Sequence, residues 1–93
     1  MLLRTDKKEA QRHRARETLR EYLGEAAPAG KLLKGVLAQI QAHDVPKGAP
    51  RLEPVATPSN SRSVYEVTIL GRLFRVTYDN KHKELENIQL LAE

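Results

Sequence analysis

The sequence predicts an α+β fold in which an N-terminal helical hairpin packs on a C-terminal three-stranded antiparallel sheet. Apolar residues recur at helical spacing in the first half of the chain and alternate at strand spacing in the second half. A proline-rich stretch separates the two patterns. Because 93 residues are few for an independently folding unit, we expect residues 1–93 to form a single domain.

The first helix is predicted over residues 6–23. Asp6 and Glu9 have the spacing of a capping box at its start, and Gly24 is typical of the left-handed residue that ends a helix. Its second half carries an apolar stripe, formed by Ala15, Leu19, Tyr22 and Leu23. Its first half is polar on every side, which indicates that this end projects into solvent or onto a partner.

The second helix is predicted over residues 30–42. One continuous apolar face supports it, formed by Leu32, Leu33, Val36, Leu37 and Ile40. Gly35 lies beside this face and indicates close approach by another element, because glycine otherwise weakens a helix. The short link after the first helix predicts a helical hairpin.

Residues 43–62 are predicted to be a long extended connector within the same domain. They hold four of the five prolines of the chain, and we expect such a connector to be either functional or mobile. Leu52 and Val55 are the residues that we expect to fix its middle onto the core.

The predicted β-meander covers residues 64–91 and begins with a hairpin whose turn we centre on Gly71 and Arg72. This register places Ile69 opposite Phe74 and puts Arg75 diagonal to Glu66. It also sorts the hairpin into two faces. The apolar face holds Tyr65, Val67, Ile69, Phe74, Val76 and Tyr78, and the polar face holds Glu66, Thr68, Arg75 and Thr77.

The third strand is predicted over residues 84–91, and its phase is ambiguous. Ile88 and Leu90 point to one face of a regular strand, whereas Leu85 and Leu91 point to the other, and a short helix is an alternative. A three-stranded meander has two open edges, so we expect a homodimer through a sheet edge or the addition of a partner's strand.

Composition limits the function. The formal net charge of +4 favours nucleic acid or an acidic protein surface as the partner. The chain has no cysteine, and no segment is apolar enough for a signal peptide or a membrane span, so we expect a cytoplasmic protein without membrane contact. The histidines, His13, His43 and His82, lack the spacing of a metal motif, and we expect neither metal nor cofactor.

Four basic residues on the first helix form a basic ridge at i, i+4 spacing, namely Lys8, Arg12, Arg16 and Arg20. In one interpretation the ridge grips phosphates or an acidic partner. In the other it is a solvated helix face, neutralised by glutamates three residues away from its arginines.

Two arginines of the hairpin, Arg72 and Arg75, are further candidates for binding nucleic acid or a protein partner. Arg75 lies in the middle of the polar face. A cross-strand ion pair with Glu66 is the alternative interpretation of Arg75, and such pairs contribute little on a solvated sheet.

The hairpin resembles the RelE/ParE-like toxins of toxin–antitoxin systems. The resemblance rests on Arg62 and Tyr65–Val67, followed by Gly71–Tyr78 with the sequence GRLFRVTY. It implies a helical hairpin followed by an antiparallel sheet, and an antitoxin-like protein partner. It also implies that Arg75 helps to bind mRNA phosphate during ribosome-dependent cleavage. Ribonuclease members carry further basic residues after the last strand, and this chain shows none beyond residue 91.

We therefore expect a small basic binding protein, resembling these toxins, that acts by binding RNA or a protein target rather than by catalysis. If it is an enzyme, Arg75 is the catalytic candidate for a ribosome-dependent mRNA endonuclease. The alternative is an inhibitor of the phage or plasmid type, which engages nucleic acid or an acidic protein surface through its arginine-rich helix.

Overall fold

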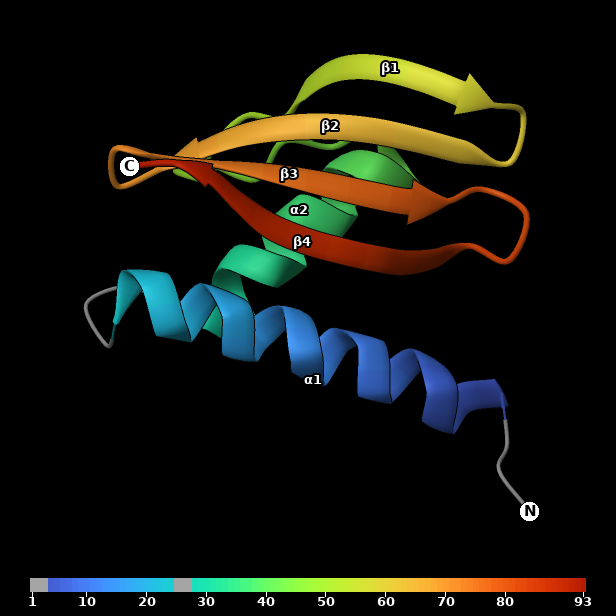
Figure 1. Cartoon of the computed structure of the whole chain (residues 1–93), viewed down its shortest axis with the longest axis horizontal. Coiled ribbons are helices and arrows are strands. Elements are labelled where there is room, and N and C mark those ends of the chain that lie inside the picture. The colour runs from blue at the N-terminus through green and yellow to red at the C-terminus, as the bar shows by residue number, and fades with distance from the viewer. Residues whose placement is uncertain (1–3, 25–27) are drawn as a thin grey trace.

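Two helices precede a four-stranded antiparallel meander in the computed structural model, which describes residues 4–24 and 28–93 (Figure 1). The fold is therefore α+β, as predicted. Its elements are α1 (Arg4–Leu23), α2 (Ala29–Ala42), β1 (Glu53–Ser59), β2 (Arg62–Ile69), β3 (Arg72–Asp79) and β4 (Glu84–Ala92). The strands are hydrogen-bonded in chain order, β1-β2-β3-β4.

The helices are placed differently against the sheet. Figure 1 shows α2 crossing behind the sheet, while α1 lies along its β4 side, and no described helix covers the near face. The core lies between the helices and the covered sheet face. Phe74 and Val76 at its centre are fully buried, and the ring of Tyr22 on α1 meets the Phe74 ring edge-on at 6.5 Å. Both helices therefore share one core with the sheet.

The bounds of both helices agree closely with the predictions. α1 ends where Gly24 adopts a positive φ of 69° and its N–H donates to the Arg20 carbonyl, as predicted. It begins at Arg4, before the predicted capping box, and the Asp6 side chain lies outside the part of the chain that is described. α2 ends as His43 turns to the left-handed conformation, with a φ of 54°.

The close approach predicted at Gly35 is present. A Cβ atom on Gly35 would lie 3.2 Å from the Cβ of Ala49. The loop before the sheet (residues 43–52, between α2 and β1) therefore packs directly on α2. Gln39, one turn further along α2, holds the same loop. Its Nε2 donates to the Pro50 carbonyl at 2.7 Å, and its Oε1 accepts from the Leu52 N–H at 2.8 Å.

The prediction of an extended connector over residues 43–62 is wrong, because this segment contains β1 and the sheet has four strands rather than three. Every residue of β1 is exposed, and Pro54 and Pro58 interrupt it. An exposed edge strand shows no alternation of apolar residues, and proline is tolerated at such an edge. Leu52 is buried as predicted, but Val55 is 48 % exposed and does not fix the strand to the core.

The predicted hairpin register is also wrong, although its two faces are correct. Val67, not Ile69, lies opposite Phe74, and Glu66 lies directly opposite Arg75. The turn residues are Leu70 and Gly71, both with positive φ, of 51° and 79°. A two-residue turn of this kind matches the twist of the flanking strands. Relative to the prediction each residue's partner moves by two positions, which leaves every side chain on its face.

β4 resolves the ambiguity of the third predicted strand. Its pairing with β3 shifts register between Thr77 and Tyr78, so β4 contains an irregularity near its start. Leu85 and Ile88 are both buried as a result, although a regular strand would place residues three apart on opposite faces.

Candidate functional site

The basic ridge of α1 winds around the helix instead of running straight along it. Residues four apart on an α-helix are rotated by about 40°. Lys8, Arg12 and Arg16 are therefore partly buried near the side that continues the apolar stripe, whereas the Arg20 side chain is 65 % exposed. The ridge thus passes from the edge of the core at its start to open solvent at its end.

Each arginine of the ridge has a different neighbour. The Arg12 guanidinium lies 3.8 Å from Glu9, and that of Arg20 lies 3.6 Å from Glu17. The Arg16 stem lies over the start of α2, since a Cβ on Gly30 would be 3.9 Å from its Cδ. Long, exposed pairs of this kind contribute little stability. Arg12 and Arg20 are therefore partly neutralised by the glutamates, as the solvated-face interpretation expects, but these long ion pairs do not hold the arginines tightly.

The two hairpin arginines lie on opposite faces of the sheet. Arg72 shares its face with Phe74, while Arg75 projects from the face that no described helix covers. Arg75 Nη2 lies 3.5 Å from a carboxylate oxygen of Glu66. Its Nε is buried and has no hydrogen-bond partner among the described residues. The candidate residues therefore occupy three places, the α1 ridge and the two sheet faces, and form no single site.

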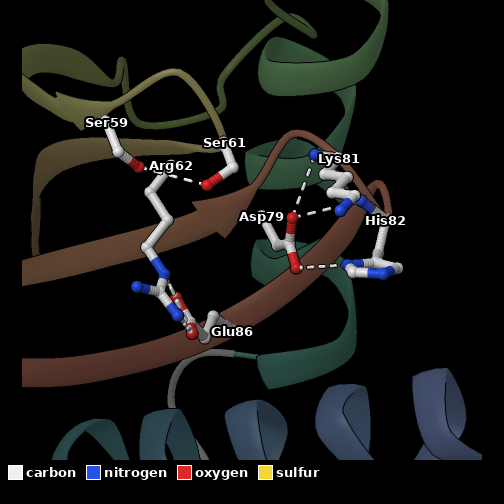
Figure 2. Close-up of polar contacts among 7 residues, drawn as sticks. All are labelled: Ser59, Ser61, Arg62, Asp79, Lys81, His82 and Glu86. Carbon is white, nitrogen blue, oxygen red and sulfur yellow. Dashed lines mark hydrogen bonds and ion pairs between the residues drawn. The ribbon is translucent and has the colours of Figure 1, made fainter.

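A polar cluster that the sequence did not predict lies across two neighbouring turns of the sheet (Figure 2). Arg62 reaches across β3 to Glu86 on β4, with Nε donating to Oε2 and Nη2 donating to Oε1, each at 2.9 Å. Ser59 and Ser61 share a hydrogen bond of 3.1 Å in the β1–β2 turn. Arg62 is thus held in a fork-like ion pair that ties β2 to β4.

Asp79 organises the β3–β4 turn. One carboxylate oxygen accepts the backbone N–H groups of Lys81 and His82 at 2.9 and 3.1 Å, and the other lies 2.8 Å from His82 Nδ1. The hydrogen bond from the His82 side chain, followed by that from its backbone N–H, holds the pKa of Asp79 below its ordinary value of 3.8. An aspartate followed by a polar turn is a sequence signal for this arrangement.

The hydrogen bonds of this cluster stabilise the two turns, and its residues do not have the arrangement of a catalytic triad. The aspartate and the histidine are three residues apart in one exposed turn, and the hydroxyls of Ser59 and Ser61 hydrogen-bond to each other and not to His82 (Figure 2). Over residues 8–24 and 28–93, whose side chains are described, no group of three acidic or histidine side chains could hold a metal ion. Neither described helix is long and apolar enough to cross a membrane.

Positive charge is concentrated in the helical part of the sequence. Residues 1–52 hold eleven basic and six acidic residues, whereas residues 53–93 hold five basic and six acidic residues. The whole excess of +4 therefore comes from the segment that contains α1, α2 and the loop before the sheet.

Comparison of the chain with protein-family models, with curated proteins and with solved structures found no match.

Proposed function

We propose that the protein is a non-catalytic RNA-binding protein whose helical half engages the phosphate backbone. The uneven charge distribution carries this proposal, because the positive excess falls entirely within residues 1–52. Lysine and arginine that neutralise phosphates supply most of the affinity in sequence-independent binding.

The contacts of Arg62 support α1 over this part of the sheet as the binding surface. Arg62 is engaged by a bidentate carboxylate at 2.9 Å, so an incoming phosphate would have to displace Glu86. The pairs of Arg12 and Arg20 on α1 are longer, at 3.8 and 3.6 Å. Exchanging such weak contacts for phosphate oxygens costs little.

The test is fluorescence anisotropy with a labelled single-stranded RNA, measured over a series of salt concentrations. Each phosphate contact contributes a slope of about −0.7 to the dependence of log K on log salt. Replacement of Arg12, Arg16 and Arg20 by Gln should therefore reduce the slope by about 2 and weaken binding at every salt concentration.

The matched control removes three charges from the sheet, by replacing Arg62, Arg72 and Arg75 with Gln. We expect this variant to bind RNA nearly as well as the unmodified protein. If it loses as much affinity as the α1 variant, the binding surface is the sheet. If the unmodified protein shows no salt-dependent RNA binding, the proposal is wrong.

An acidic protein surface is the second kind of partner that the same charge distribution favours, as an inhibitor would use. It differs from RNA in which ligand depends on the ridge arginines. A pull-down of an acidic protein by the unmodified protein, but not by the variant with Arg12, Arg16 and Arg20 replaced by Gln, together with no anisotropy change on RNA, would favour this function over RNA binding.

A relationship to RelE/ParE-like toxins is a further proposal, favoured by Arg75. This arginine follows Phe74 on β3, is 42 % exposed, and projects from the open sheet face, where an RNA strand has access to it. If it serves mRNA cleavage, expression of the protein should arrest growth, and Arg75→Ala should abolish the arrest while Arg72→Ala leaves it in place. Normal growth with intact mRNA contradicts cleavage.

A homodimer through a sheet edge also stays a prediction. The sheet has two edge strands, β1 and β4. The β4 side carries α1, so β1 is the more open edge for a second copy (Figure 1). Pro54 and Pro58 of β1 donate no backbone hydrogen bonds, which limits pairing there. Light scattering should show a mass that rises with concentration if the edge pairs, and a constant monomer mass contradicts it.

A further inference from the structure

A groove of about 530 Å³ lies between α2 and the loop before the sheet. Its apolar surface comes from both sides, with Leu32 and Ala38 on α2 and Ala49 and Pro50 on the loop. A volume of this size is typical of sites for small organic molecules.

The loop that forms one wall is held in place at several points. Gly48 has a positive φ of 82°, and the Ala49 N–H donates to the Pro46 carbonyl at 3.0 Å, so the loop closes on itself. Gln39 clamps the backbone of Pro50 and the residue two positions later. The groove is therefore formed before any ligand binds, which lowers the entropic cost of binding.

Three lysines line the groove beside its apolar surface, and no acidic residue of the described part of the chain lines it. Lys31 and Lys34 come from α2 and Lys47 from the loop, and none of them forms an ion pair with a described acidic residue. A lysine side chain lays its apolar stem along such a surface and places its ammonium group at the edge. The groove therefore combines an apolar floor with a positively charged rim.

We propose that this groove binds an amphipathic organic anion, with an apolar body against Leu32, Ala38 and Ala49 and a single anionic head between the lysines. Charge complementarity selects the anion over a neutral or cationic molecule with the same body. The limited volume favours a small molecule over a folded partner. This site is separate from the α1 ridge and does not depend on RNA binding.

The test is calorimetric titration of the full chain with decanoate below its micelle concentration. We expect saturable binding with one site, and no comparable binding of decyltrimethylammonium, which has the same chain and the opposite charge. Equal binding of both amphiphiles, no binding of decanoate, or preferential binding of a short acidic peptide overturns the proposal.

Two variants locate the site. Ala38→Leu fills the groove with a good helix former and should abolish binding, while circular dichroism checks that the protein stays folded. Lys34→Gln with Lys47→Gln should weaken binding about tenfold, since each exposed charge contributes modestly. The matched control, Lys81→Gln with Lys83→Gln in the β3–β4 turn, removes the same charge and should bind as before. Unchanged binding by both groove variants overturns the assignment.

Discussion

The helical half of the molecule and its sheet half hold their charges in different ways. On the sheet, Arg62 and Arg75 each face a carboxylate on a neighbouring strand, and residues 53–93 are close to neutral. In residues 1–52, basic residues outnumber acidic ones by eleven to six, and the ion pairs described on α1 are long and exposed. Arg62 of the sheet therefore serves a contact between strands, whereas the proposed RNA binding would use the positive excess of the helical half.

The largest effect is expected where the helical half and the sheet half share their core. Phe74 is fully buried on β3, and its ring meets Tyr22 of α1. Phe74→Ala should lower the free energy of unfolding by about 3–5 kcal/mol, because it leaves a cavity where helices and sheet meet. Urea unfolding followed by circular dichroism measures this loss.

The control for that variant is Val55→Ala on β1, where the side chain is 48 % exposed. It should change the free energy of unfolding by about 0.5 kcal/mol or less. If Phe74→Ala lowers the free energy of unfolding by no more than a typical surface substitution does, the two halves are stable without their shared core.

The next largest effect is expected at the polar clamp between α2 and the chain entering the sheet. Gln39→Ala leaves the Leu52 N–H and the Pro50 carbonyl without the partner that they have now. The free energy of unfolding should fall by about 1–3 kcal/mol, the usual range for abandoned, partly buried polar groups. Gln89→Ala, an exposed glutamine on β4, is the matched control and should be nearly neutral.

A smaller effect, and a gain, is expected in the sheet half at Leu70. This residue adopts a φ of 51° in the β2–β3 turn, where a branched side chain is strained. Leu70→Asn should raise the free energy of unfolding by about 0.5–1 kcal/mol, since asparagine before glycine favours this turn. Arg72→Asn is the control. If it stabilises instead, the turn lies one residue later, as the sequence predicted.

That turn shows why the sequence predicts the faces of the sheet but not its register. Alternation reports only which residues share a face, and a displacement of the partner by two positions leaves the faces unchanged. The register depends on the backbone of Leu70 and Gly71, and a leucine gives no sign in the sequence that it will adopt a positive φ. The sequence does not predict β1 for a related reason, because an exposed strand with two prolines has no apolar pattern.

The candidate sites show the same limit. Spacing correctly places the ridge residues on one helix, but the burial of Lys8, Arg12 and Arg16 depends on where the sheet lies. The groove depends on a loop packed against a helix, a long-range contact that no local pattern encodes. Gly35 was its one sequence signal, and the close approach predicted there is confirmed by its distance from Ala49.

The smallest effect concerns the turn in which the sheet half satisfies its own charge. The His82 side chain is the main cause of the lowered pKa of Asp79, with the backbone N–H groups of His82 and Lys81 adding to it. Because the pKa of Asp79 is lower in the folded protein than in the unfolded chain, its stabilising contribution is present above about pH 4. That contribution is lost as the pH falls through the folded pKa.

NMR titration of the Asp79 carboxyl carbon should give a midpoint below 3.8, and His82→Ala should raise it. His13→Ala, which alters an exposed histidine of α1, should leave the midpoint unchanged. A midpoint at or above 3.8 in the unmodified protein would mean that the turn is open in solution, and that the sheet does not satisfy its charges as fully as the contrast with the helices requires.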